Sequence, residues 1–172
     1  MSGQRFLIAL GSNMPHHRFG APRRVVSEAL RELDRAGLTL CGAAPCIASR
    51  PLGPSRRTYA NSVALVVSDL PPPRVLERLQ AIERRFGRRR RGSRWGPRVL
   101  DLDIVLWSGG IWHSPGLAIP HVRFRERRFV LQPAARLAPR WRDPESGLTL
   151  THLAARLTRP KPHPTARPRS GP

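Results

Sequence analysis

The sequence predicts an α+β domain with a ferredoxin-like core, in which the chain runs strand, helix, strand, strand, helix, strand. Short apolar runs bounded by turn residues indicate strands. Two intervening segments carry apolar residues at helical spacing, which indicates amphipathic helices. In a fold of this order an antiparallel sheet carries both helices on one face, and we expect the other face to be free to hold a ligand.

The first part of the chain predicts a strand, a helix and an extended segment. Residues 5–10 form a short apolar run that ends in Gly-Ser-Asn, as expected of a buried strand. A helix is expected from about Pro22, and Gly37 is suited to end it. Residues 38–49 are interpreted as extended, and Pro45 favours an edge strand or a bulge.

A third strand and a second helix follow. Residues 61–68 have the alternation of a strand, with Val63, Leu65 and Val67 on one face. The prolines at 71–73 start the helix and Gly87 ends it. Its apolar stripe consists of Val75, Leu79, Ile82 and Phe86.

The fourth predicted strand, residues 99–107, carries two acids in an apolar run. Side chains alternate along a strand, so Asp101 and Asp103 are expected on one face. The core-facing set is Leu100, Leu102, Ile104 and Leu106. Neighbouring carboxylates repel unless a cation or proton relieves them. An arginine-rich loop at 88–97 precedes the strand, and carboxylates for magnesium beside arginines for phosphate suit nucleotide triphosphate chemistry.

The remainder predicts a C-terminal helical extension. A loop leads to the segment Ile119-Pro120-His121, and a helix is expected over residues 129–137, disturbed by Pro133. Thr151 is predicted to cap a last helix that runs through Leu157.

The length of 172 residues suits one domain with a tail. We assign residues 1–157 to the domain. Residues 158–172 are rich in Pro and Arg without an apolar pattern, so we expect a disordered basic tail.

The chain is strongly basic, with 31 Lys and Arg against 11 Asp and Glu and a formal charge of +20. This charge favours polyanionic or phosphorylated partners. Lys161 is the only lysine, and so complete a bias toward arginine also suggests genome composition. An RNA-binding module on a ferredoxin-like sheet is the alternative function, but it needs stacking aromatics on its central strands, where this chain has Asp101 and Asp103. We expect no specific nucleic-acid partner, only a non-specific polyanion affinity that depends steeply on salt.

Compartment and assembly are expected from weaker signals. Cys41 and Cys46 are too few for a disulfide scaffold and lack zinc spacing, which fits a reducing compartment. No apolar run suits a signal peptide or a membrane span. We therefore expect a cytoplasmic monomer without a membrane partner.

Five motifs occur in an order that resembles a known family. They are Ile8-Ala9-Leu10-Gly11-Ser12-Asn13, Pro51-Leu52-Gly53-Pro54, Tyr59-Ala60-Asn61, the run from Arg94 to Ile104 that contains Arg-Trp-Gly-Pro-Arg and Leu-Asp-Leu-Asp, and Ile119-Pro120-His121. Together they are similar to 6-hydroxymethyl-7,8-dihydropterin pyrophosphokinase of folate biosynthesis, over about residues 6–157. The resemblance implies transfer of pyrophosphate from ATP to the pterin hydroxymethyl group, with AMP released and two Mg²⁺ ions as cofactors.

The resemblance also implies roles for individual residues. Those implied for catalysis are Arg88, Arg98, Asp101 and Asp103, of which the two aspartates also bind metal. Those implied for ATP binding are Gln80, Glu83, Arg88, Arg90, Trp95, Arg98, Ile104 and His121. Those implied for pterin binding are Ser49, Leu52, Tyr59, Asn61, Trp95 and Phe129.

Each role has a structural alternative. The aspartates would pair with Arg94 or Arg98 on a solvated strand face, and single arginines would be solvated. Gln80 and Glu83 would lie on a solvated helix face. Similarly, His121 would be structural or simply exposed, Phe129 would pack in the core, and Asn61 would be a strand-start or turn residue.

Several positions depart from the family pattern. Arg50 stands where proline is common, and Val122 stands where an aromatic residue is frequent. Residues 123–128 are unusually basic. None of these departures removes a proposed metal ligand.

Overall fold

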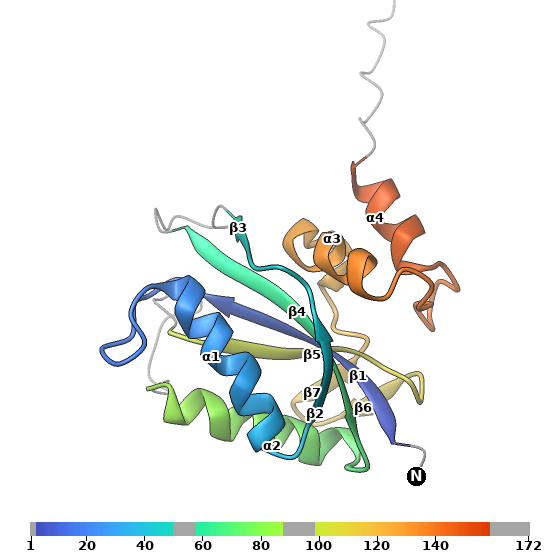
Figure 1. Ribbon diagram of the computed structural model, residues 1–172. Coiled ribbons are helices and arrows are strands. Elements are labelled where there is room, and N and C mark those ends of the chain that lie inside the picture. The colour runs from blue at the N-terminus through green and yellow to red at the C-terminus, as the bar shows by residue number, and fades with distance from the viewer. Residues whose placement is uncertain (1–2, 50–57, 88–98, 159–172) are drawn as a thin grey trace, which may run out of the picture.

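A computed structural model describes residues 3–49, 58–87 and 99–158. Its centre is an antiparallel sheet in the order β2-β4-β1-β5, with a short strand β3 paired to β4 (Figure 1). The strands are β1 (Gln4–Ser12), β2 (Thr39–Ala43), β3 (Ile47–Ser49), β4 (Tyr59–Ser68) and β5 (Asp101–Trp107). The chain order β1, α1, β2, β4, α2, β5 confirms the predicted ferredoxin-like core. The extended segment at 38–49 is split into β2 and β3 around Pro45.

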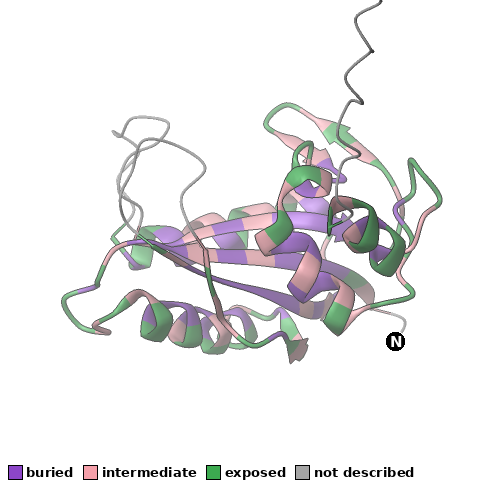
Figure 2. Cartoon of the chain, turned by 90° about the horizontal axis from the view of Figure 1, so that it is seen from above, coloured by how far each residue is buried: buried purple, intermediate pink, exposed green. Residues whose placement is uncertain are grey.

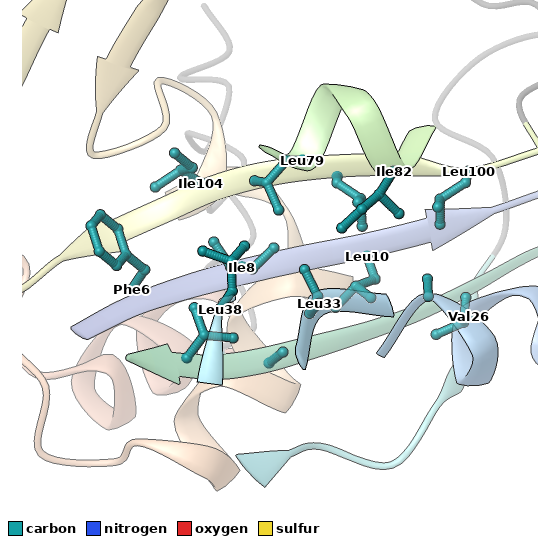
Figure 3. Packing of buried hydrophobic residues seen from close by; sticks show 14 of the residues in the cluster. Phe6, Ile8, Leu10, Val26, Leu33, Leu38, Leu79, Ile82, Leu100 and Ile104 are labelled. Carbon is teal, nitrogen blue, oxygen red and sulfur yellow. The ribbon is translucent and has the colours of Figure 1, made fainter. Parts of the chain in front are cut away.

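Two helices cover one face of the sheet. They are α1 (Pro22–Arg35) and α2 (Pro72–Arg85), and each has proline in its first turn, where the missing N–H costs nothing. Gly37 and Gly87 follow them with positive φ, as helix-ending glycines do. The apolar stripes of both helices pack on the sheet, as Figure 3 shows for Leu33, Leu79 and Ile82 against Ile8 and Leu10.

The C-terminal extension differs in part from the prediction. It contains the 3₁₀ turn η1 (Phe124–Glu126) and the helices α3 (Arg128–Leu137) and α4 (Leu150–Thr158), and it is preceded by a hairpin of β6 (Trp112–Ser114) and β7 (Leu117–Ile119) that was not predicted. The predicted cap of the last helix, Thr151, is wrong by two residues. The helix begins earlier, and the hydroxyl of Thr149 accepts a hydrogen bond from the His152 N–H at 3.2 Å. The Thr151 hydroxyl donates instead to the Pro139 carbonyl at 3.0 Å.

The second face of the sheet is open over only part of its length. At one end α3, α4 and η1 pack on it and bury Leu7, Val63 and Val105 in a second apolar cluster. Figure 2 shows the result, with buried residues along the sheet and exposed residues on the outer sides of the helices. The expectation of a free face is therefore wrong at this end, where β4 and β5 carry apolar residues that need a cover.

A β-bulge in β5 separates the two ends. Leu7 pairs with Leu106 and Ile8 with Ile104, so Val105 is an extra residue that changes the alternation. Before the bulge, Leu100, Leu102 and Ile104 lie in the core under α1 and α2, as predicted. The prediction for Leu106 is wrong, because after the bulge it belongs to the cluster under α3 and α4.

No helix among the described residues is long and apolar enough to cross a membrane. The predicted domain boundary cannot be compared with the structure beyond Thr158, the last residue of α4. Residues 159–172, which make up most of the predicted tail, lie outside the described residues.

Candidate active site

The paired aspartates lie at the open end of the second sheet face. Asp101 pairs with Gly11 and Asp103 with Ala9, while Leu102 between them is 3% exposed in the core. The two carboxylates therefore share one face, as predicted. The Asp103 side chain is 36% exposed, so it is accessible to a ligand from solvent.

Two cationic or neutral donors approach Asp103 from the segment that follows β7. Nε2 of His121 lies 3.8 Å from Oδ2 of Asp103, and a guanidinium nitrogen of Arg127 lies 3.7 Å from the same oxygen. Both distances exceed a hydrogen bond, but the Arg127 charge still attracts the carboxylate at this separation. The carboxylate thus has compensating charge beside it and is not locked in a bidentate pair with these groups.

His121 is held in place by its backbone and by one ring nitrogen. Its N–H donates to the Val105 carbonyl at 3.0 Å, and Nδ1 accepts from the Arg123 N–H at 3.1 Å. An accepting Nδ1 places the proton of a neutral imidazole on Nε2, which faces Asp103. Burial lowers the pKa of His121, an effect that outweighs the opposing influence of Asp103. The ring is therefore a neutral N–H donor at the site near pH 7.

Arg127 was not among the predicted site residues. Its Nε is buried and has no hydrogen-bond partner among the described residues, while its guanidinium carbon lies 5.9 Å from the centre of the Phe129 ring. A buried N–H group without a hydrogen bond costs free energy, so this donor is suited to an anionic acceptor. The basic run at 123–128 was the available sequence signal, but it does not show which arginine turns toward the aspartates.

Three of the predicted pterin residues, Ser49, Tyr59 and Asn61, lie near one another where β3 pairs with β4. Gly11 of β1 pairs with Asn61 of β4 on one side and with Asp101 of β5 on the other. The side chains of Asn61 and Asp101 therefore lie on the same face of the sheet. Asn61 is 4% exposed and donates from Nδ2 to the Ser49 hydroxyl at 2.7 Å. Ser49 pairs with Tyr59 at the end of the same strands. Asn61 is thus a buried residue near the start of β4, as its strand-start alternative expected, and it is not in a turn.

Phe129 lies in the first turn of α3 and packs against the cluster under α3 and α4 while also facing Arg127. Its core-packing alternative is therefore correct for part of the ring. A pterin contact by Phe129 stays a prediction.

The side chains of two predicted ATP residues are buried. Glu83 on α2 is 4% exposed, and its Oε1 accepts from the Leu102 N–H at 2.8 Å. The solvated-face alternative is therefore wrong for Glu83, which holds β5 between the two aspartates. The Ile104 side chain is 3% exposed in the core, so any contact it makes with ATP must involve its backbone. Gln80 is partly exposed on α2.

The other predicted site residues, Arg88, Arg90, Trp95, Arg98 and Leu52, lie outside the described residues. So do Arg50 and Arg94. Within the described residues, no cluster of three or more His, Cys, Asp or Glu side chains forms a complete metal cage. Two carboxylates on one strand face fit Mg²⁺ instead, because this ion is bound by one or two carboxylates together with phosphate oxygens and water.

Among the described residues, a sheet face that carries two carboxylates, a histidine N–H donor and an arginine with a buried, unbonded Nε is typical of a phosphoryl-group transferase. Comparison with known proteins agrees. Residues 7–139 match the model of the family described as 7,8-dihydro-6-hydroxymethylpterin-pyrophosphokinase.

Two relatives carry the name 2-amino-4-hydroxy-6-hydroxymethyldihydropteridine pyrophosphokinase. The protein from Pseudomonas aeruginosa is 42% identical over 88% of this chain and 91% of its own length. The protein from Haemophilus influenzae is 38% identical over 76% of this chain and 79% of its own length. A crystal structure of Plasmodium falciparum HPPK-DHPS matches with a TM-score of 0.65 and 10% identity, over 90% of this chain and 44% of that one. This last likeness concerns the fold alone.

The chain belongs to the 7,8-dihydro-6-hydroxymethylpterin-pyrophosphokinase family.

Proposed function

We propose that this chain transfers the pyrophosphoryl group of ATP to the hydroxymethyl group of 6-hydroxymethyl-7,8-dihydropterin. The pterin hydroxyl oxygen forms a bond to the β-phosphorus, the bond from that phosphorus to the oxygen bridging the α-phosphate breaks, and AMP leaves with that electron pair. The hydroxyl proton is released to solvent water in the same step, which balances the reaction. The products are the pterin diphosphate and AMP.

The observation that carries the proposal is the shared face of Asp101 and Asp103 beside His121 and Arg127. Asp101 and Asp103 would hold the two Mg²⁺ ions, which supply positive charge against the triphosphate when bound. Nε2–H of His121 and the buried Nε–H of Arg127 are donors for phosphate oxygens. These residues position and neutralise the triphosphate, which is the main contribution a protein makes to phosphoryl transfer.

The pterin is assigned to the row that contains Asn61, beside Ser49, Tyr59 and Phe129. Asn61 supplies an amide for the polar edge of the pterin, and the aromatic rings supply flat faces for stacking. Arg88, Arg90, Trp95, Arg98, Leu52 and Gln80 keep the roles that the family resemblance implies.

The proposal includes a monomer that works in the cytoplasm. Cys41 and Cys46 are both free thiols, which suits a reducing compartment. Light scattering of the purified chain tests the monomer, and a monomer mass is expected with or without ATP.

Isothermal titration with a non-hydrolysable ATP analogue tests the site. We expect binding that requires Mg²⁺, pterin binding that strengthens once the analogue is bound, and AMP production when ATP and pterin are both supplied. Asp101→Asn and Asp103→Asn should each lower kcat at least 100-fold, whereas Asp69→Asn, an exposed aspartate outside the site, should leave it unchanged. Equal activity in all three variants would contradict the proposed site.

A further inference from the structure

A second hollow lies on the same sheet face as the candidate active site but at the opposite end. It has a volume of about 690 Å³ and opens between the first residues of β1, the end of β5 and the segment that follows α3. Pockets for small molecules usually enclose about 300–1,000 Å³. α3 and the apolar cluster beneath it separate this hollow from Asp101 and Asp103.

The hollow is lined by three arginines and no acid. They are Arg5, Arg140 and Arg142, and the described residues give neither Arg5 nor Arg140 an ion-pair partner. Arg142 donates one hydrogen bond to the Gly147 carbonyl at 2.8 Å, which fixes its direction and leaves other N–H groups of its guanidinium for a ligand. Three guanidinium groups around one hollow favour an anion, and phosphate oxygens match their fork of donors.

The rest of the lining is apolar and includes one large aromatic ring. Leu65, Leu137 and Pro139 form part of the wall, and Trp141 lies among the arginines. The guanidinium carbon of Arg5 is 5.7 Å from the centre of the Trp141 ring. Arg5 lies over one face of the indole, and the other face of the indole is suited to stacking on a planar ring. The lining therefore suits a ligand with a flat body and an anionic end.

The segment that carries Trp141 is fixed by backbone hydrogen bonds. The Trp141 N–H donates to Ala138 at 3.0 Å and its carbonyl accepts from Leu150 at 2.9 Å. The Pro139 carbonyl accepts from both the N–H and the hydroxyl of Thr151. Because these bonds are independent of any ligand, the hollow is formed before a ligand binds, which lowers the entropy cost of binding.

We propose that this hollow binds a phosphorylated small molecule with a planar ring, of the size of a nucleoside monophosphate. The concave shape and limited volume favour one small molecule over a nucleic-acid strand. The site is separate from the one assigned to ATP and pterin, and it does not depend on the proposed reaction.

Calorimetric titration of the whole chain with AMP in the presence of EDTA tests the proposal. We expect saturable binding with one AMP per chain, at least tenfold tighter than the binding of inorganic phosphate or of adenosine. The double variant Arg5→Gln/Arg140→Gln should weaken AMP binding at least tenfold. The control Arg24→Gln/Arg156→Gln removes the same charge from exposed positions on α1 and α4. It should change the affinity for AMP less than twofold.

A second variant separates this site from the candidate active site. Asp101→Asn/Asp103→Asn should bind AMP in EDTA as tightly as the unaltered chain. The proposal is overturned if AMP does not bind saturably, or if inorganic phosphate binds as tightly as AMP. It is also overturned if the two arginine double variants lose AMP affinity equally. It is also overturned if a single-stranded oligonucleotide binds more tightly than AMP and loses affinity in the Arg5→Gln/Arg140→Gln variant alone.

Discussion

At the scale of single residues, the absence of a side chain at Gly11 shapes the candidate site. Gly11 lies between Asn61 and Asp101 in one row of the sheet. A methyl group built at Gly11 would lie 3.3 Å from Oδ1 of Asn61. The backbone there does not have positive φ, so the requirement for glycine is one of space.

Gly11→Ala should therefore impair pterin binding with little effect on stability. We expect the KM for the pterin to rise about tenfold, equivalent to about 1.4 kcal/mol, because Asn61 is displaced. The free energy of unfolding should change by less than about 1 kcal/mol, since alanine also restricts the unfolded chain. Steady-state kinetics and urea unfolding measure the two effects. An unchanged KM would show that Asn61 does not contact the substrate.

Glu83 provides a second prediction at this scale, because it accepts a hydrogen bond from the Leu102 N–H between the two aspartates. Glu83→Ala leaves that N–H without its acceptor and should cost about 1–3 kcal/mol of stability and raise the KM for ATP. Glu83→Gln keeps an oxygen acceptor and should cost less. Thermal unfolding and kinetics distinguish the variants, with Glu77→Gln on the exposed side of α2 as the control. If Glu83→Gln is as unstable as Glu83→Ala, the hydrogen bond to β5 is not what Glu83 contributes.

The sequence allowed part of the site to be predicted. The alternation of a strand was enough to place Asp101 and Asp103 together, because that rule is local. The approach of Arg127 to Asp103 was missed, since it depends on how the chain returns through β6, β7 and η1. The buried position of Glu83 was missed for the same reason, because the sequence alone does not show that α2 packs beside β5.

At the scale of elements, a buried ion pair anchors the segment that carries His121 and Arg127. Arg125 of η1 donates two hydrogen bonds to Asp143, at 2.8 and 2.6 Å, and Asp143 is fully buried. Burial raises the pKa of Asp143, but hydrogen bonds from Arg125, Ser146 and Glu145 lower it by more, so that it lies below its usual value. The pair joins η1 to the loop between α3 and α4.

Asp143→Asn should destabilise the protein by about 3 kcal/mol, because Arg125 loses a buried partner. A depressed carboxyl pKa stabilises the fold above the unfolded pKa of about 4, and this contribution is lost as pH falls through the lower folded value. The difference in free energy of unfolding between the original chain and the variant should thus have its largest value at pH 7 and shrink below about pH 4. Urea unfolding across this range measures it.

Glu145→Gln serves as the control for the anchor. Glu145 also faces Arg125, at 2.9 Å, but its side chain is 45% exposed. Its loss should cost less than about 1 kcal/mol. A constant difference between the original chain and Asp143→Asn from pH 7 to pH 3 would contradict the assigned role of the Asp143 carboxylate.

The elements with strong periodic patterns were predicted correctly, but the hairpin of two very short strands was not. The stripe of α2 and the apolar run of β1 each contain enough residues to show a period. The hairpin of β6 and β7 has three residues in each strand, too few to show one. The bulge at Val105 was also missed, because an uninterrupted apolar run does not reveal which residue is extra.

At the scale of the whole molecule, the charge of +20 and the specific site are separate properties. Family membership supports the pyrophosphokinase, and the RNA-binding alternative gains no support. The excess of arginine should still attract polyanions without sequence preference.

We expect RNA oligonucleotides of different sequence to bind with similar affinity, and binding should fall at least 100-fold between 50 and 200 mM salt, as for proteins that contact several phosphates. Pyrophosphoryl transfer at saturating substrates should fall by less than about threefold over the same range. Fluorescence anisotropy and an AMP assay measure the two quantities. A strong preference for one RNA sequence that persists at high salt would indicate a specific nucleic-acid partner instead.

The extra residue in β5 has a consequence for how this chain can diverge. Upstream of Val105, substitutions are constrained by the two carboxylates and by packing under α1 and α2. At Val105 and Leu106 they are constrained by the fit of the C-terminal helices. Substitutions in the two parts of β5 can thus accumulate under different constraints, provided that the bulge at Val105 is retained.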